Sequence, residues 1–237
     1  MLAVPFAEQT KSEPALSTEV RDDWILSVTN VTPLFSKFTA GLGSFTSTTH
    51  LRIFSGGMDT SNYASDGQFA LSWLSGEQVG GNSPYIGETM VLFHSVPHMP
   101  PGVNNRKRHV GNDVVHIIFY DNSSCSPTIN QCDYNNIISG EFCFVTIFVT
   151  PVCADKFVKV TLTIREDLSE EIKKSLDYLS SSVIIPFDAS PVYTRELAIR
   201  ADIACRSLIQ DRLGLVSNWQ ERLQQIQSLD RYTMSAA

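Results

Sequence analysis

Residues 106–119 read Arg106-Lys107-Arg108-His109-Val110-Gly111-Asn112-Asp113-Val114-Val115-His116-Ile117-Ile118-Phe119, a charged and polar segment that leads directly into an apolar one. The apolar part, from Val114 to Phe119, has the composition of a buried β-strand. A strand of this kind belongs to a rigid scaffold, and such a scaffold can hold a polar segment at its edge. We therefore predict that residues 106–113 lie at the end of a buried strand.

The polar segment combines groups that suit an anionic partner. Its three cations, Arg106, Lys107 and Arg108, favour binding of a negatively charged surface. Gly111 permits a close approach of the backbone, and Asn112 offers a hydrogen-bond donor and an acceptor without carrying a charge. These properties fit a group that orients water beside a phosphate. Taken alone, the same residues also fit a basic turn ahead of a strand, with no chemical role.

Further apolar runs predict more strands on both sides of this segment. They are Trp24–Val28, Leu51–Phe54, Gln68–Trp73, Thr89–Val96, Phe142–Val149 and Phe157–Ile164. In the last run apolar and polar residues alternate, which indicates a strand with one buried and one wetter face.

Helical patterns lie mainly in the last third of the chain. The predicted helices are residues 33–42, 168–179, 190–213 and one that begins at Ser217. Pro33 stands in the first turn of the earliest helix and Gly43 lies just beyond its end, as is common at helix termini. The predicted fold class is α/β (mixed α+β), with a central mixed β-sheet flanked by helices and a helical C-terminal segment.

The length of 237 residues suits one large domain. Residues 1–22 are polar, with scattered Pro, Ser and Thr, and we predict a flexible N-terminal segment there. The domain is then expected to span residues 23–237. Within it, the Gly/Ser-rich stretch Ser75–Pro84 is predicted to be mobile.

The overall composition argues against several classes of function. The net charge of −7 disfavours a general nucleic-acid-binding protein, which is normally basic. The longest apolar run, from Phe142 to Val152, is too short to cross a bilayer, and we expect no direct membrane insertion and no signal peptide. Five cysteines without close pairing indicate reduced thiols and a cytoplasmic location.

Several segments, in order, resemble the Rap/tuberin family of GTPase-activating domains, and its tuberin-type branch most of all. They are Leu34–Gly43, Gly56–Ser61 with Asp66–Phe69, Arg106–Asp113, and Tyr193–Ala198 continuing to Trp219 and Leu223. The resemblance covers roughly residues 34–230. The first thirty or so residues and the Ser75–Pro84 insertion match poorly, whereas the segment around Asn112 is well matched.

This resemblance implies that the chain stimulates GTP hydrolysis by a small Ras-like GTPase. Members of the family insert an asparagine, the Asn thumb, into the partner's active site to orient the attacking water. In this chain the thumb is expected to be Asn112. GTP and Mg²⁺ would belong to the GTPase, so we expect no cofactor, no metal site and no stand-alone turnover.

The resemblance also implies roles for other residues. The expected catalytic residues are Asn112 and His109, and the expected GTPase-binding residues are Arg106, Lys107, Arg108, Asp113 and Arg195. His109 lies three residues before Asn112, so in a helical turn the two side chains would share a face. His109 would hold the thumb segment or contact the GTPase, or simply pack at a turn. Arg108 is a rival candidate as an arginine finger, and Asp113 fits a role in fixing the local backbone better than one in the chemistry.

For a tuberin-type domain the expected substrate is Rheb, in the regulation of TOR signalling. Hamartin would bind through parts of a longer protein, and partners would recruit the chain to lysosomal or vacuolar membranes. Three alternatives stay open. The chain could activate Rap or Ral GTPases, bind a GTPase without activating it, or hydrolyse a substrate alone.

Two other motifs are interpreted as structural. Gly56-Gly57 with Asp59 lacks the pattern of a phosphate-binding P-loop, and we interpret it as a turn. His94 and His98 have a metal-ligand spacing, but Pro97 interrupts any helix between them and no zinc motif accompanies them.

Overall fold

The computed structural model describes residues 2–6, 26–29, 31–51, 54–61, 65–75, 89–120, 142–152, 156–166, 168, 170–177 and 182–213. The chain divides into two compact units, residues 1–202 and residues 203–237. Every described strand and every residue of the predicted site lie in the first unit. Among the described helices, none combines the length and the apolar character that a membrane span requires.

The first unit is built on a mixed sheet, which has eight strands among the described residues. The strands are β1 Leu2–Phe6, β2 Ser44–Ser47, β3 Phe69–Leu74, β4 Met90–Ser95, β5 Val115–Tyr120, β6 Val145–Val152, β7 Phe157–Ile164 and β8 Ser182–Pro186. Their order across the sheet is β2-β3-β4-β1-β5-β6-β7-β8. The central strands β4, β1, β5 and β6 pair in parallel, and the pairs at both edges are antiparallel.

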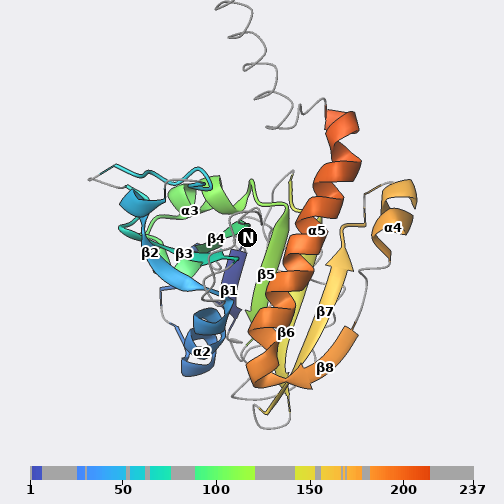
Figure 1. The fold of residues 1–237 in the computed structure, drawn as a ribbon, viewed down its shortest axis with the longest axis horizontal. Coiled ribbons are helices and arrows are strands. Elements are labelled where there is room, and N and C mark those ends of the chain that lie inside the picture. The colour runs from blue at the N-terminus through green and yellow to red at the C-terminus, as the bar shows by residue number, and fades with distance from the viewer. Residues whose placement is uncertain are drawn as a thin grey trace, which may run out of the picture. The chain divides into compact units, whose positions relative to one another are not determined.

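The described helices are α2 Pro33–Leu42, α3 Val103–Val110, α4 Glu170–Leu176 and α5 Ser190–Leu213 (Figure 1). Short 3-10 turns occur at η1 Thr48–His50, η2 Val96–His98 and η5 Phe187–Ala189. Helix α2 has the predicted bounds, because Thr32 caps its first turn by accepting a hydrogen bond from the backbone N–H of Phe35 and Pro33 needs no partner there.

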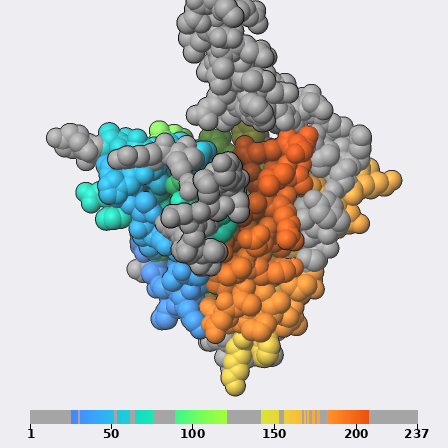
Figure 2. Space-filling view, viewed as in Figure 1, coloured from blue at the N-terminus to red at the C-terminus, as the bar shows by residue number. Residues whose placement is uncertain are grey.

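Aromatic side chains fill the core on one face of the sheet. Phe119 of β5 contacts Phe35 and Phe38 of α2, with ring centroids 5.8 and 5.0 Å apart, and Phe187 of η5 at 6.4 Å. Helix α2 and the start of α5 lie side by side on this face, in blue and orange in Figure 2, where Gly41 leaves room for Pro191. All six residues of β5 are buried, as expected for a central parallel strand covered on both faces.

The mixed sheet flanked by helices confirms the predicted fold class. Each of the strands β3 to β7 overlaps a predicted run, and β7 has the predicted bounds. Helices α4 and α5 lie within their predicted ranges. The helix predicted from Ser217 and residues 76–84 of the predicted mobile stretch lie outside the described residues.

Two predicted strands are wrong where the structure describes them. Leu26 and Val28 do not pair in the sheet, because their carbonyl groups accept hydrogen bonds from a buried arginine side chain instead. Leu51 directly follows η1 and Phe54 directly precedes a turn, so neither belongs to a strand.

The flexible N-terminal segment predicted for residues 1–22 needs correction at Leu2–Phe6. These residues form β1, which lies between β4 and β5 in the middle of the sheet. Proline is uncommon inside a sheet because it cannot donate to a hydrogen-bond ladder. Pairing of β1 with β4 covers only Leu2 and Ala3, however, so Pro5 lies beyond it and pairs only with β5. Residues 7–22 lie outside the described part of the chain.

Candidate functional site

Residues 106–113, the predicted thumb segment, lie on α3 and on the turn that joins this helix to β5. The turn is tight, because the backbone N–H groups of Asn112 and Asp113 donate to the carbonyls of His109 and Val110, at 3.2 and 3.0 Å. Gly111 N–H donates to the Lys107 carbonyl at 2.8 Å, and a Cβ at Gly111 would stand only 2.8 Å from that oxygen. A side chain at this position would therefore crowd the Lys107 carbonyl.

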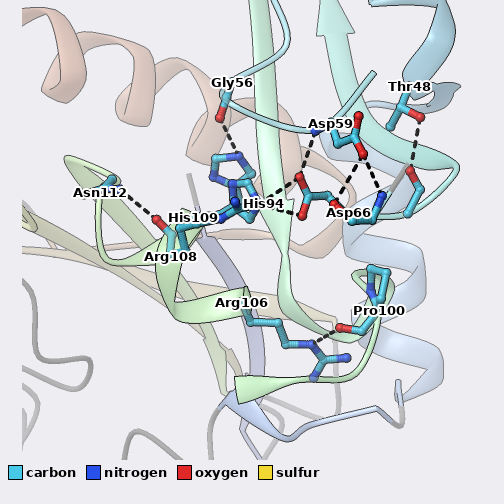
Figure 3. Close-up of polar contacts among 12 residues, drawn as sticks. Thr48, Gly56, Asp59, Asp66, His94, Pro100, Arg106, Arg108, His109 and Asn112 are labelled. Carbon is cyan, nitrogen blue, oxygen red and sulfur yellow. Dashed lines mark hydrogen bonds and ion pairs between the residues drawn. The ribbon is translucent and has the colours of Figure 1, made fainter. Parts of the chain in front are cut away.

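Asn112 stands exposed on this turn. Its Nδ2 donates a hydrogen bond of 2.7 Å to the carbonyl oxygen of Arg108, one helical turn earlier (Figure 3). Because the carboxamide is planar, fixing the amino end also fixes the direction of Oδ1, which is an acceptor. The side chain thus presents an oriented acceptor at the surface.

A buried carboxylate, that of Asp66, holds the helix from the side. Asp66 is 1% exposed and accepts from Arg108 Nη2 at 2.9 and 3.2 Å, and His109 Nε2 lies 3.1 Å from its Oδ1. Its Oδ2 also accepts from the backbone N–H of Asp59 at 2.8 Å. Burial acts to raise the pKa of Asp66, but the hydrogen bonds from Asp59 and His109 outweigh it and lower the pKa.

The carboxylate is presented next to a turn at Gly56 and Gly57. Both glycines have positive φ angles, which confirms the interpretation of this segment as a turn. The carboxylate of Asp59 accepts backbone hydrogen bonds from Ser61 and Ser65, each at 2.9 Å, and these lower its pKa to about 2. Polar groups of the segment itself therefore fix Asp59, whose backbone N–H binds Asp66.

Histidines of the sheet also contact the end of α3 and the turn at residues 111–113, which we call the thumb turn. His94 of β4 contacts the Asp113 carboxylate through Nδ1 at 2.8 Å and the Gly56 carbonyl through Nε2 at 3.1 Å. His116 of β5 contacts the last residue of α3, with its Nε2 3.0 Å from the carbonyl of Val110. Burial acts to lower the pKa of His116, but interactions with Cys143 and Asp113 raise it overall. The end of α3 is thus held by two histidines from neighbouring parts of the sheet.

Arg106 does not have the surface position that docking to a GTPase would need. Its side chain is 1% exposed and donates to the carbonyls of Pro100, Leu26, Val28 and Met99 at 2.7 to 3.0 Å. Arg106 lies on the face of α3 that packs against the interior, so this cation of a basic run is buried and serves a structural role. The predicted docking role of Arg106 is corrected accordingly.

Arg195 needs the same correction. It is 3% exposed on α5, and its Nη1 donates to the carbonyls of Gly41 and Leu42 at 3.0 and 2.8 Å. Its guanidinium also lies 4.4 Å above the ring of Trp73. Arg195 therefore satisfies the carbonyls at the C-terminus of α2, which have no partner within that helix, and joins two helices to the sheet.

The remaining predicted residues divide into an exposed and a buried group. Arg108 keeps 59% of its side chain exposed, and Lys107 is half-buried beside it. His109 is buried, while Asn112 is exposed, so the expectation that they share a face is wrong. The helix ends at Val110, and the turn beyond it directs Asn112 away from the interior. Asp113 is largely buried against His94, consistent with a role in fixing the backbone.

Sequence reasoning missed the supporting roles of Asp66 and His94. A signal was present, because Asp59 and Asp66 bracket a connection rich in turn residues, and His94 interrupts an apolar strand. Polar residues at such places need a partner when they are buried. Among the described residues, no three His, Cys, Asp or Glu side chains are grouped as metal ligands.

Known proteins resemble the chain along most of its length. The model of the Rap/ran-GAP family matches residues 25–228. The tuberous sclerosis 2 protein homolog of Schizosaccharomyces pombe is 30% identical over 224 residues, which are 88% of this chain and 15% of that protein. The chain therefore spans less than a sixth of the length of this relative.

A solved structure of the TSC2 GAP domain has the same fold, with a TM-score of 0.61. The match covers 88% of this chain and 97% of that one, at 24% sequence identity. The family match and the fold agree with each other. The chain thus belongs to the Rap/ran-GAP family.

Proposed function

We propose that this chain accelerates GTP hydrolysis by a small Ras-like GTPase and that Asn112 is the residue it contributes. Membership of the Rap/ran-GAP family supports GTPase activation in general. The observation that supports Asn112 is its exposed carboxamide, held by one end on the Arg108 carbonyl at 2.7 Å.

The chemistry needs little from the activator beyond correct positioning. Phosphoryl transfer from GTP depends on an in-line water and on neutralisation of the developing charge, and the GTPase already brings the nucleotide and Mg²⁺. Asn112 Oδ1 would accept a hydrogen bond from the attacking water and so orient it. Because the carboxamide is neutral, it adds no negative charge beside the phosphates. No cofactor of the chain itself enters this proposal.

Docking is assigned to the two cations near Asn112 that are not buried, Lys107 and Arg108. Lys107 and Arg108 lie on the last turns of α3, within the reach of any partner that receives Asn112. Arg108 is less suited to serve as an arginine finger, because its Nη2 is already bonded to the buried carboxylate of Asp66. We therefore assign the chemical role to Asn112 and the docking role to Lys107 and Arg108.

Rheb is the GTPase that we propose as the partner, with Rap and Ral as the alternatives. The proposal is supported by the similarity to a tuberous sclerosis 2 protein homolog and to the TSC2 GAP domain. A link to TOR signalling, assembly with hamartin through a longer protein, and a cytoplasmic location with recruitment to lysosomal or vacuolar membranes are proposals on the same basis.

The test is single-turnover GTP hydrolysis by Rheb, Rap and Ral, each with and without the chain. Replacing Asn112 by Ala is expected to reduce the acceleration by roughly 10²–10³-fold, the usual effect of removing one positioned carboxamide. Asn104→Ala is the matched control, because Asn104 is an exposed asparagine on α3, the helix that leads to Asn112. Arg108→Ala should weaken association more than the catalytic step.

The other outcomes separate the alternatives. If Arg108→Ala abolishes turnover while Asn112→Ala does not, an arginine finger replaces the thumb. Binding without acceleration of any GTPase would identify a silent scaffold domain. Turnover of GTP by the chain alone would identify a hydrolase.

A further inference from the structure

His94 lies beneath the thumb turn and is bonded on both sides of its ring. It is 5% exposed, and its two nitrogens contact the Asp113 carboxylate at 2.8 Å and the Gly56 carbonyl at 3.1 Å. The ring of His109 lies beside it at a tilt of 39°, with the two ring centroids 5.0 Å apart (Figure 3). His94 therefore joins the turn at Gly56 to the residue that directly follows Asn112.

Both partners of the ring are hydrogen-bond acceptors. The Gly56 oxygen is a carbonyl and can only accept. Aspartate is ionised at neutral pH, so the Asp113 side chain, 2.8 Å from Nδ1, is a carboxylate that accepts. A neutral imidazole carries one N–H and can satisfy only one of the two acceptors. The observed pair of contacts requires an N–H on each nitrogen.

We propose that His94 is a positioning residue of the thumb, whose doubly protonated ring donates to Gly56 and Asp113 and so fixes the backbone that carries Asn112. The proposal rests on the function proposed above for Asn112. His94 does not reach the surface and would not touch the nucleotide. It would act by restricting the turn, because a small displacement of a catalytic group is costly.

The charged groups around the ring come from several elements. Asp113 faces Nδ1 directly, and His116 of β5 acts on the same carboxylate. On the other side, the tilted ring of His109 lies against the ring of His94 and is bonded to Asp66, which also binds Arg108.

The expected consequence of this arrangement is kinetic. When a substitution removes the hydrogen bonds of the ring, the turn that carries Asn112 loosens and the acceleration of GTP hydrolysis falls. The KM for the GTPase should change little, since the docking residues Lys107 and Arg108 are not involved.

The kinetic test compares two substitutions with a control. His94→Phe keeps the ring and removes both hydrogen bonds, and it is expected to lower kcat by roughly 10–100-fold with KM within about twofold. His94→Gln supplies one donor and should recover part of the loss. His50→Gln, at an exposed histidine of η1, should leave kcat and KM unchanged.

Two measurements decide the proposal without using activity. Long-range ¹H–¹⁵N NMR spectra of the ¹⁵N-histidine-labelled chain, assigned with His94→Gln, should show imidazolium shifts for both His94 nitrogens. Hydrogen exchange of the Asn112 and Asp113 amides should be faster in both His94 variants than in the wild type, with β5 amides unchanged. A neutral His94 tautomer in the folded wild-type chain, or unchanged exchange of these two amides, would overturn the proposal.

Failure of the proposed function has a different signature. In that case wild-type chain would accelerate no GTPase, while the spectra and the exchange rates would still report on the His94 tie. If Asn112→Ala loses the acceleration but His94→Phe and His94→Gln retain it fully, the function stands and the positioning role is wrong.

Discussion

Arg106 and Arg108 are two positions apart on α3, and the helix directs one inward and the other outward. A separation of two residues corresponds to about 200° around a helix, so neighbouring cations can have opposite surroundings. Arg106 satisfies four carbonyl groups in the interior, whereas Arg108 keeps 59% of its side chain exposed beside Asn112. Interior carbonyls require such a donor because unpaired buried polar groups are costly.

Replacing Arg106 by Met is expected to lower the free energy of unfolding by about 3–5 kcal/mol, because buried carbonyls of several loops lose their shared donor. Urea denaturation followed by circular dichroism measures the change. Arg108→Met is the matched control on the same helix and should cost about 0–1 kcal/mol, as is usual for exposed ion-pairing residues. Equal losses in the two variants would contradict the clamp assigned to Arg106.

Asp66 gives a prediction about acid stability. Its pKa is lowered in the folded chain, so its contribution is complete above the unfolded value of about 4 and is lost as the pH falls through the lower folded value. Asp66→Asn should therefore reduce stability at pH 7, by about 1–3 kcal/mol, and flatten the loss of stability below pH 4. Urea midpoints measured between about pH 2 and 7 test this. An unchanged slope in the variant would show that Asp66 is not a source of the acid dependence.

At the scale of elements, the thumb turn depends on parts of the chain that are distant in sequence. Helix α3 is held by Asp66, and the residue after Asn112 is held by His94 of β4. Strand β1 pairs with β4 at His94 itself and with β5 at His116. The integrity of the central sheet therefore bears on the geometry of the site.

A pair of substitutions in β1 tests its place in the sheet. Ala3 has partners in both β4 and β5, so Ala3→Pro removes a ladder hydrogen bond and should cost about 3 kcal/mol or more. Pro5 pairs only with β5, and Pro5→Ala should change stability by less than about 1 kcal/mol. Thermal or urea unfolding compares them. A harmless Ala3→Pro would mean that residues 2–6 are not a central strand.

The regular elements were predictable where local pattern and burial agree. Helix α2 has a capping Thr32 and Pro33 at its start, and β7 alternates apolar and polar residues, so both were predicted with the observed bounds. Strand β1 was missed because Pro5 and the surrounding polar residues conceal a short apolar run. The short strands β2 and β8 were not predicted either, although Val183, Ile184 and Ile185 of β8 have strong β preference.

The site was predictable as a segment and not as a set of contacts. The sequence placed Asn112 and the basic residues on one stretch, and the structure exposes Asn112 there. Which cations face inward depends on carbonyl groups of distant loops, such as those of Leu26 and Gly41. No local pattern reports such tertiary partners, so Arg106 and Arg195 were given docking roles that their burial excludes.

At the scale of the whole molecule, an acidic chain carries an exposed basic group beside a neutral carboxamide. The net charge is −7, yet Lys107 and Arg108 precede Asn112 on the same helical end. A local cationic patch of this kind favours one docking surface over general binding to nucleic acids. The family match and the fold agree with a domain that acts on a GTPase partner.

The most direct measurement is single-turnover GTP hydrolysis by Rheb with the chain, with its Asn112→Ala variant and with the Asn104→Ala control. We predict strong acceleration by the wild-type chain and by the control, and a loss of roughly 10²–10³-fold in Asn112→Ala with little change in association. Full acceleration by folded Asn112→Ala chain would contradict the account.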